Sequence, residues 1–274
     1  MKIKNNWPIF SFIISIVVGF IMLFPFFMVL LNSFKGRISI IRDPMSFSGF
    51  VGFDNYVNAF KTMNYLGAIK NSIAVSGLSL VVIVVFSSMF AYFLERWQWK
   101  INKIIFLVIV ASMIIPFQTL MIPLVSIYGS IGVLNSGGSL IFFYLGFGMA
   151  MATFMYHGFV KGVPKELEEA ALLDGCGKLE TFWRIVFPNL APITATIIIL
   201  DLLWIWNDYL LPSLVLIRET QRTLPLSTFY FFGNYTSEFG YGMAALIMSI
   251  APILILYLIL QRQIISGVMN GSIK

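Results

Sequence analysis

The stretch Ile104–Val160 (IIFLVIVASMIIPFQTLMIPLVSIYGSIGVLNSGGSLIFFYLGFGMAMATFMYHGFV) contains no Asp, Glu, Lys or Arg. As one α-helix it would be about 85 Å long, which far exceeds the roughly 30 Å hydrocarbon core of a bilayer. The chain must therefore fold back, and the run Tyr128–Gly138 (YGSIGVLNSGG), rich in Gly, Ser and Asn, is the predicted turn. The stretch predicts two membrane-crossing helices, at about 104–127 and 140–160.

The whole chain has the composition of an integral membrane protein. Of its 274 residues 59% are hydrophobic and only 11% are charged, which is too little polar surface to cover a soluble fold. This excludes a soluble enzyme, a disordered tail, a collagen-like chain and a disulfide scaffold. The lone Cys176 excludes an internal disulfide and a cysteine-rich metal site. The basic residues stand singly between apolar runs, which is typical of membrane borders and not of a nucleic-acid-binding surface.

Further apolar runs on both sides of the central stretch are long enough to cross a bilayer, at about 9–31, 71–94, 191–217 and 240–260. They lack the period-2 alternation of a membrane barrel, so they are predicted to be helices. The first run is too long for a cleavable signal and no small-residue cleavage site follows it, so we expect it to remain as an anchor. The predicted fold is an all-α integral membrane protein, with residues 1–274 forming one transmembrane domain of six helices.

The distribution of Lys and Arg predicts the orientation. With both termini in the cytoplasm, eleven of these residues lie on the inner side and seven on the outer side. The short basic stretch 95–103 (ERWQWKINK) contributes most to this prediction of orientation. Both termini are therefore expected to be cytoplasmic.

The predicted cytoplasmic loop 161–190 (KGVPKELEEAALLDGCGKLETFWRIVFPNL) lies between the fourth and fifth spans and is unusually charged. Pro164 suits the start of a short acidic helix, and Asp174-Gly175 predicts its end. A second short helix is expected at about 178–187, followed by Pro188. Its apolar stripe has helical spacing and comprises Leu179, Phe182, Trp183 and Val186. From these features alone, an ordinary pair of interfacial helices is the main alternative to a docking element.

The spacing of residues inside this loop resembles the EAA loop of ABC-importer permeases. That motif consists of Glu-Ala-Ala, three residues, Gly, nine residues, Ile, one residue, Leu and Pro. The positions that match it are Glu169, Ala170, Ala171, Gly175, Ile185 and Pro188. Phe187 stands where Leu is usual, and Asp174 before the glycine also looks like the family.

Two further segments extend the resemblance to most of residues 100–274. The segment Trp206–Pro212 (WNDYLLP) resembles one at the outer end of the fifth span in sugar permeases, and the tail Gln261–Lys274 resembles that of the smaller permease of maltose-type systems. The N-terminal third agrees in layout only. The whole is similar to the six-span permeases of maltose-type carbohydrate importers.

This resemblance implies a transport subunit without catalysis of its own, in a bacterial or archaeal cell (inner) membrane. It would form half of the translocation path for a sugar or oligosaccharide. The implied partners are a second homologous permease, two ATPase subunits, an extracellular or periplasmic solute-binding protein and membrane lipid. ATP and Mg²⁺ would be bound by the ATPases, since the only Gly-Lys pair in this sequence, Gly177-Lys178, is followed by Leu179 and not by the Ser or Thr of a phosphate loop.

The resemblance also implies how the loop works. Its first helix would dock in a cleft of an ATPase and carry the movement of that subunit into the membrane helices. Small Ala170 and Ala171 would allow close seating, with Glu169 as a charged partner, and Gly175 would permit the turn. Ile185 and Pro188 would fix the second helix and its joint to the fifth span.

Polar residues in the fifth span are candidates for the substrate path. A carboxylate at Asp201 costs about 2.5–3.5 kcal/mol inside a membrane, so it should face a partner helix or a water-filled path. Trp204, Asn207 and Asp208 combine aromatic, amide and carboxylate groups, as a sugar site does. An inter-helix hydrogen bond and an interfacial aromatic belt are the respective alternatives. The lone His157 is expected to be packed or interfacial and not catalytic, and no metal site is expected.

Three other functions were compared with this interpretation. A permease for a non-sugar solute could carry the same loop. A secondary transporter would be expected to show two related halves, and no internal repeat is visible. An intramembrane enzyme would need paired carboxylates, a Ser/His pair or clustered metal ligands within the spans, which one histidine and one deeply placed aspartate do not supply.

Overall fold

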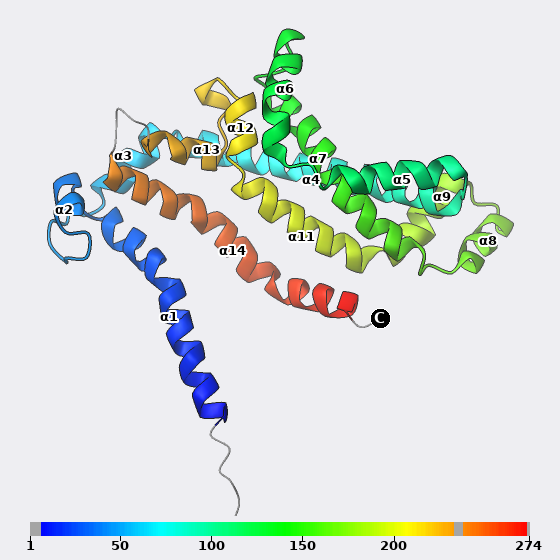
Figure 1. Ribbon diagram of the computed structural model, residues 1–274, viewed down its shortest axis with the longest axis horizontal. Coiled ribbons are helices and arrows are strands. Elements are labelled where there is room, and N and C mark those ends of the chain that lie inside the picture. The colour runs from blue at the N-terminus through cyan, green and yellow to red at the C-terminus, as the bar shows by residue number, and fades with distance from the viewer. Residues whose placement is uncertain (1–6, 233–237, 273–274) are drawn as a thin grey trace, which may run out of the picture. The chain divides into compact units, whose positions relative to one another are not determined.

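The computed structural model describes residues 7–232 and 238–272, and within these ranges every regular element is a helix (Figure 1). Four helices are long and apolar enough to cross a membrane. They are α1 (Trp7–Ser33), α4 (Tyr65–Arg96), α7 (Gly137–Val160) and α14 (Phe239–Ser272). Two bent helix pairs raise the number of candidate crossings to as many as six.

The predicted third span, 104–127, is not one straight helix. Helix α5 (Lys100–Ser112) and helix α6 (Phe117–Ser130) meet at 102° across a short break. Pro116 stands at the N-cap of α6, where it has no N–H to continue α5 and restricts the residue before it. The proline therefore bends this segment although its composition is apolar throughout.

The predicted fifth span, 191–217, is helical only in part. Helix α11 (Ala191–Asn207) ends before Asp208, whose backbone is extended, and α12 (Leu210–Val215) follows. The Asp208 Oδ1 accepts hydrogen bonds from the N–H groups of Leu210 (2.9 Å) and Leu211 (3.4 Å). These bonds satisfy donors at the start of α12 and favour a new helix over continuation of α11.

The predicted turn at 128–138 is confirmed. Helix α6 ends at Ser130 and α7 begins at Gly137. Between them Gly132 and Asn135 have positive φ angles of 70° and 67°. Ser136 caps α7 by accepting a hydrogen bond from the Ser139 N–H at 3.0 Å.

The chain forms two compact units, which are described separately. The first comprises residues 1–65 and 227–252. Its described elements are α1, α2 (Arg37–Arg42), α3 (Asp54–Thr62), η3 (Tyr230–Phe232) and the beginning of α14. Fully buried Lys35 donates from Nζ to the Pro44 carbonyl (3.0 Å), and Asn55 donates to the carbonyls of Ser33 (2.8 Å) and Lys35 (2.9 Å). These bonds hold the segment between α1 and α3 in place.

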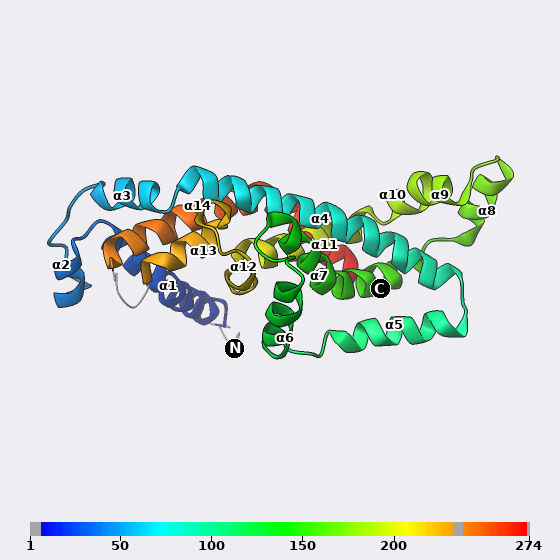
Figure 2. The same cartoon turned by 90° about the horizontal axis from the view of Figure 1, so that it is seen from above.

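The second unit comprises residues 66–226 and 253–274. Helices α7 and α11 lie side by side in it, as the two views show, and Tyr156 donates from its hydroxyl to Thr194 Oγ1 at 2.9 Å (Figures 1 and 2). The buried face of α4 is lined mainly by small side chains, which allow close helix approach. They include Ser72, Ser76, Ser79, Ser87, Ser88 and Ala91. The remaining helical elements are α8 (Lys165–Leu173), α9 (Lys178–Thr181), η1 (Phe182–Val186), α10 (Phe187–Asn189), η2 (Glu219–Gln221) and α13 (Leu224–Phe229), the last of which continues into the first unit.

Candidate functional site

The segment between α7 and α11 forms a compact group of short helices at one end of the second unit. Helices α8 and α9 lie near the end of α4 (Figures 1 and 2). The two expected short helices are therefore present. The first begins at Lys165 after Pro164, and Glu166 and Glu168 occupy its first turn, where carboxylates stabilise the helix N-terminus.

One face of α8 is fixed to α4 by an ion-pair cluster, which comprises Tyr92, Arg96 and Glu168. Arg96 Nη2 lies 2.6 Å from Glu168 Oε1, and the Tyr92 hydroxyl donates to Glu168 Oε2 at 2.7 Å. Arg96 Nη2 also donates to the Val163 carbonyl at 2.9 Å. The Arg96 and Glu168 side chains are only 9% and 11% exposed. The pair is buried and its atoms are at hydrogen-bond distance. Displacement of either helix would leave a buried charge unpaired, so the pair holds α8 in register with α4.

The opposite face of α8 is exposed. It carries residues at helical spacing, namely Glu166, Glu169, Ala170 and Leu173. Leu173 is 90% exposed, and neighbouring Leu172 is 48% exposed. We call the four residues the outer face of α8. Small and apolar side chains beside carboxylates give this face the character of a surface that another protein could cover.

Ala170 and Ala171 have different environments. Ala170 belongs to the outer face, whereas Ala171 is 6% exposed and packs inside this chain. Only Ala170 is placed where close seating against a partner would need a small residue. Ala171 is small because α8 packs closely on its own unit.

Gly175 forms the turn after α8. Its φ angle is +90°, and its N–H donates to the Leu172 carbonyl at 3.1 Å. The next N–H, of Cys176, donates to the Ala171 carbonyl at 3.0 Å. These two bonds are those of a Schellman motif, which requires a left-handed residue at this position and therefore favours glycine. The prediction of a stop at Asp174-Gly175 is confirmed, with Asp174 as the C-cap.

The second short helix is longer than expected and changes its pitch. It runs through α9, the π-helical turn η1 and α10, and it ends at Asn189. Pro188 therefore lies inside the helix and not at its end. In the π-helical turn the Phe187 N–H donates to the Phe182 carbonyl, five residues back. The chain then bends by 77° into α11.

The predicted apolar stripe of this helix is buried only in part. Phe182 and Val186 are 2% and 0% exposed, whereas Leu179 is 60% exposed. Ile185 is half-buried and Pro188 is exposed. The π-helical turn shifts the residue positions relative to a regular α-helix, which a fixed spacing of 3.6 residues does not anticipate.

The four path candidates, in α11 and at its C-cap, are not brought together in one site. Asn207 donates to the Leu203 carbonyl of its own helix at 2.7 Å, and Asp208 accepts from the Tyr144 hydroxyl at 3.0 Å while it caps α12. Asp201 and Trp204 share a different environment. Both line a cavity of about 590 Å³ that is formed by α7, α11 and the bend between α5 and α6.

Asp201 is the buried carboxylate of this cavity. It is 7% exposed, and its Oδ2 has no hydrogen-bond partner among the described residues. The indole of Trp204 is 41% exposed and makes an edge contact with Tyr144 at 5.5 Å. The two side chains therefore combine an apolar ring and an unsatisfied acceptor, whereas Asn207 and Asp208 have local structural partners.

Sequence reasoning missed the ion-pair cluster. Glu168 lies one residue before the matched Glu169, and its partner Arg96 is 72 residues away in the chain, so no local sequence pattern points to the pair. His157 is packed as expected, with its ring stacked on Phe106 at 4.1 Å and its Nε2 3.1 Å from Glu95. Within the described ranges, no group of three or more His, Cys, Asp or Glu side chains could hold a metal ion.

Comparison with known proteins identifies the family. The model for the "binding-protein-dependent transport system inner membrane component" family matches residues 83–269. The probable starch degradation products permease AmyC of Thermoanaerobacterium thermosulfurigenes is 41% identical over 95% of both chains. The multiple sugar-binding transport permease MsmG of Streptococcus mutans is 34% identical and covers 100% of this chain and 98% of its own.

A solved structure has the same fold. A chain of a bacterial ABC transporter for import of the acidic polysaccharide alginate superposes with a TM-score of 0.75. It covers 96% of this chain and 98% of its own at 19% identity, so the likeness concerns the fold alone. The match of the family model over most of the sequence and the full-length relatives lead to one conclusion: this chain belongs to the family of inner-membrane components of binding-protein-dependent transport systems.

Proposed function

We propose that this chain is the permease subunit of an ATP-driven importer for a sugar or oligosaccharide, and that it forms half of the translocation path. Family membership supports the transport role. The names of relatives support the substrate class, because they specify starch degradation products, multiple sugars and the melibiose, raffinose and stachyose group.

The proposed complex contains this chain, a second homologous permease, two ATPase subunits and an external solute-binding protein. The family description supports the binding protein, as does the related fold in an alginate transporter solved with its periplasmic protein. ATP and Mg²⁺ are assigned to the ATPase subunits, since this sequence contains no phosphate loop. Transport, and not catalysis, is the role of this chain.

The single observation that carries the proposed coupling is the two-sided environment of α8. Its inner face is tied to α4 through the buried ion-pair cluster, whereas its outer face, with Glu169 and Ala170, is open. A helix held in this way can transmit a displacement of a partner subunit directly to a membrane helix. Asp174 and Gly175 end it, while Ile185 and Pro188 belong to the helix that joins it to α11.

For the substrate path we assign Asp201 and Trp204, which line one cavity. A carboxylate acceptor without a partner and an exposed aromatic ring suit the hydroxyl groups and apolar faces of a sugar. Asn207 and Asp208 have local structural partners and are the weaker candidates.

The proposed topology has six crossings with both termini in the cytoplasm, namely α1, α4, the bent pair α5–α6, α7, α11 and α14, and it places α8 to α10 on the cytoplasmic side. In a Cys176→Ser background, a membrane-impermeant thiol reagent added outside intact cells should label Asp54→Cys, in the predicted outer loop, and should leave Glu169→Cys unlabelled. Both positions are exposed, so a difference in labelling reports the side of the membrane. Permeabilised cells serve as the control, in which both should react. Labelling of Glu169→Cys from outside would reverse the orientation.

Reconstitution tests the proposed function. Vesicles that contain this chain, its sister permease and two ATPase subunits should take up radiolabelled maltooligosaccharide or raffinose-type sugars when loaded binding protein and ATP are supplied. This chain alone should give no uptake and no ATP hydrolysis. Uptake by this chain alone, without ATPases, would identify a secondary transporter. Uptake of amino acids or inorganic ions but of no sugar would retain the importer and reject the carbohydrate.

A further inference from the structure

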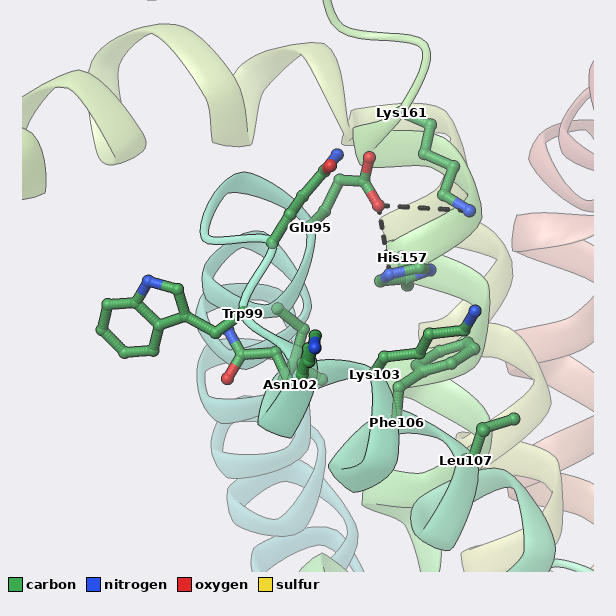
Figure 3. Close-up of a pocket in the computed structure, with 11 residues that line it drawn as sticks. Glu95, Trp99, Asn102, Lys103, Phe106, Leu107, His157 and Lys161 are labelled. Atoms are coloured by element: carbon green, nitrogen blue, oxygen red, sulfur yellow. Dashed lines mark ion pairs between the residues drawn. The ribbon is translucent and has the colours of Figure 1, made fainter.

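A second pocket lies on the other side of the α4 terminus from the ion-pair cluster. It is an open pocket of about 500 Å³ that is lined by the ends of α4, α5 and α7 (Figure 3). This size is typical of pockets for small ligands. Asn102 is 3% exposed and donates to the Trp97 carbonyl at 2.5 Å, which fixes the start of α5 against the end of α4. This hydrogen bond therefore fixes two of the helix ends that line the pocket.

The polar lining of this pocket is basic. Its lining contains three lysines, Lys100, Lys103 and Lys161, and one carboxylate, Glu95, besides the neutral Gln98 and Asn102. That carboxylate is already engaged, with Oε2 3.1 Å from His157 Nε2 and 4.0 Å from Lys161 Nζ. Lys100 and Lys103 form no ion pair with any described residue. Figure 3 shows Lys103 and Lys161 reaching to the same side of the pocket as the His157 ring. The site thus offers ammonium groups to an anion that this chain does not supply.

The lining also contains apolar side chains, and an apolar surface continues from them along α5. Phe106 and Leu107 belong to the pocket, and Leu107 is 56% exposed. Beyond them α5 exposes an apolar surface, with Ile104 at 55% and Val108 at 63% exposed. Trp99 at the rim is 59% exposed, and tryptophan is typical of the boundary between lipid and water. Ammonium groups at this boundary and a hydrocarbon surface below it match an amphiphilic anion better than a free one.

We propose that this pocket binds the head group of an anionic phospholipid, with its phosphate near Lys100 and Lys103 and an acyl chain along α5. Basic pockets between membrane helices on the cytoplasmic side are suited to such head groups. The inference requires that α4, α5 and α7 cross the membrane, but it does not depend on which solute is imported. Failure of the sugar assignment would leave it unchanged.

The test uses the purified complete complex. It is reconstituted in nanodiscs of phosphatidylcholine with phosphatidylglycerol, released from them, and analysed by native mass spectrometry. The wild-type complex should retain phosphatidylglycerol in preference to phosphatidylcholine. The double variant Lys100→Gln/Lys103→Gln should retain about 25-fold less, since each lysine near an anionic lipid contributes roughly a fivefold factor. The matched control Lys61→Gln/Lys165→Gln removes the same charge from two exposed positions outside the pocket and should behave like wild type.

Three results would overturn the proposal. Equal retention by the pocket variant and the control variant would show that bulk charge, and not the pocket, selects the lipid. Displacement of the lipid by millimolar inorganic phosphate would identify a site for free anions. Absence of any retained phospholipid from the wild-type complex would show that the pocket binds no lipid, and a partner subunit would then be its expected occupant.

Discussion

Replacement of Arg96 by Met is expected to abolish uptake while the chain remains in the membrane. Arg96 supplies the only cationic partner of Glu168 among the described residues, and both side chains are about nine-tenths buried. Loss of one member of a buried pair typically costs about 3–5 kcal/mol, because the remaining charge stays desolvated. Methionine preserves most of the apolar stem. Glu168 would have to leave its position, and α8 would lose its attachment to α4.

Substrate-stimulated ATP hydrolysis and uptake, measured in reconstituted vesicles, check this result. The matched control is Arg184→Met, which removes a guanidinium from an exposed pair with Glu180 at 3.0 Å. Such pairs contribute about 0–1 kcal/mol, so this variant should transport normally. The double variant Arg96→Met/Glu168→Gln should recover much of the lost activity, because the buried charge is gone and the Tyr92 hydroxyl can still donate to the amide oxygen. Normal uptake by Arg96→Met would show that the ion-pair cluster does not hold α8.

Gly175→Val is expected to lower uptake by at least about fivefold without loss of the chain from the membrane. No atom lies within 4 Å of the Cβ that a substitution would add, so steric contact with neighbours is not the cause. The cause is the φ angle of +90°, which a β-branched residue strongly resists. Strain of this kind costs about 1–3 kcal/mol, or roughly five- to 150-fold in the population with the correct turn. In the molecules that do not form the correct turn, the Schellman hydrogen bonds after α8 would be lost.

The informative control at this position is Gly175→Asn. Asparagine adopts left-handed conformations more easily than other non-glycine residues, so its uptake should lie between those of valine and wild type. Membrane abundance is measured for all three proteins by quantitative blotting. Equal uptake by the valine and asparagine variants would mean that the turn geometry after α8 is not needed for transport.

The sequence predicts those features that depend on local chemistry. Long apolar runs identify the helices, Asp174-Gly175 marks the turn, and the turn at 128–138 follows from its glycines and asparagine. The bend at Pro116 was missed because the segment remains apolar across the break. The helix end before Asp208 was missed because an apolar run resumes after Asn207 and Asp208 and continues to Ile217. The ion-pair cluster was missed because Arg96 and Glu168 are 72 residues apart, and only the fold brings them together.

Local sequence also fails to distinguish Ala170 from Ala171 within the loop. Both are small and adjacent, and their types alone do not reveal that one is exposed and the other buried. That distinction depends on which face of α8 packs on α4. The residue types therefore predict that a helix forms here, while the buried charge of Glu168 determines how it is rotated.

The π-helical turn at Phe182–Val186 gives the loop a constraint of length as well as of composition. A π turn has the geometry of an α-helix into which one residue has been inserted. Because the extra residue is confined to one wide turn, removal of one residue there would restore ordinary pitch and leave the parts before and after the turn in nearly the same relative rotation. A second added residue would have no such turn to absorb it and would rotate Gly175 and α8 by about 100° relative to α11. The segment between Gly175 and Pro188 should therefore tolerate the loss of one residue at the π turn better than the gain of one.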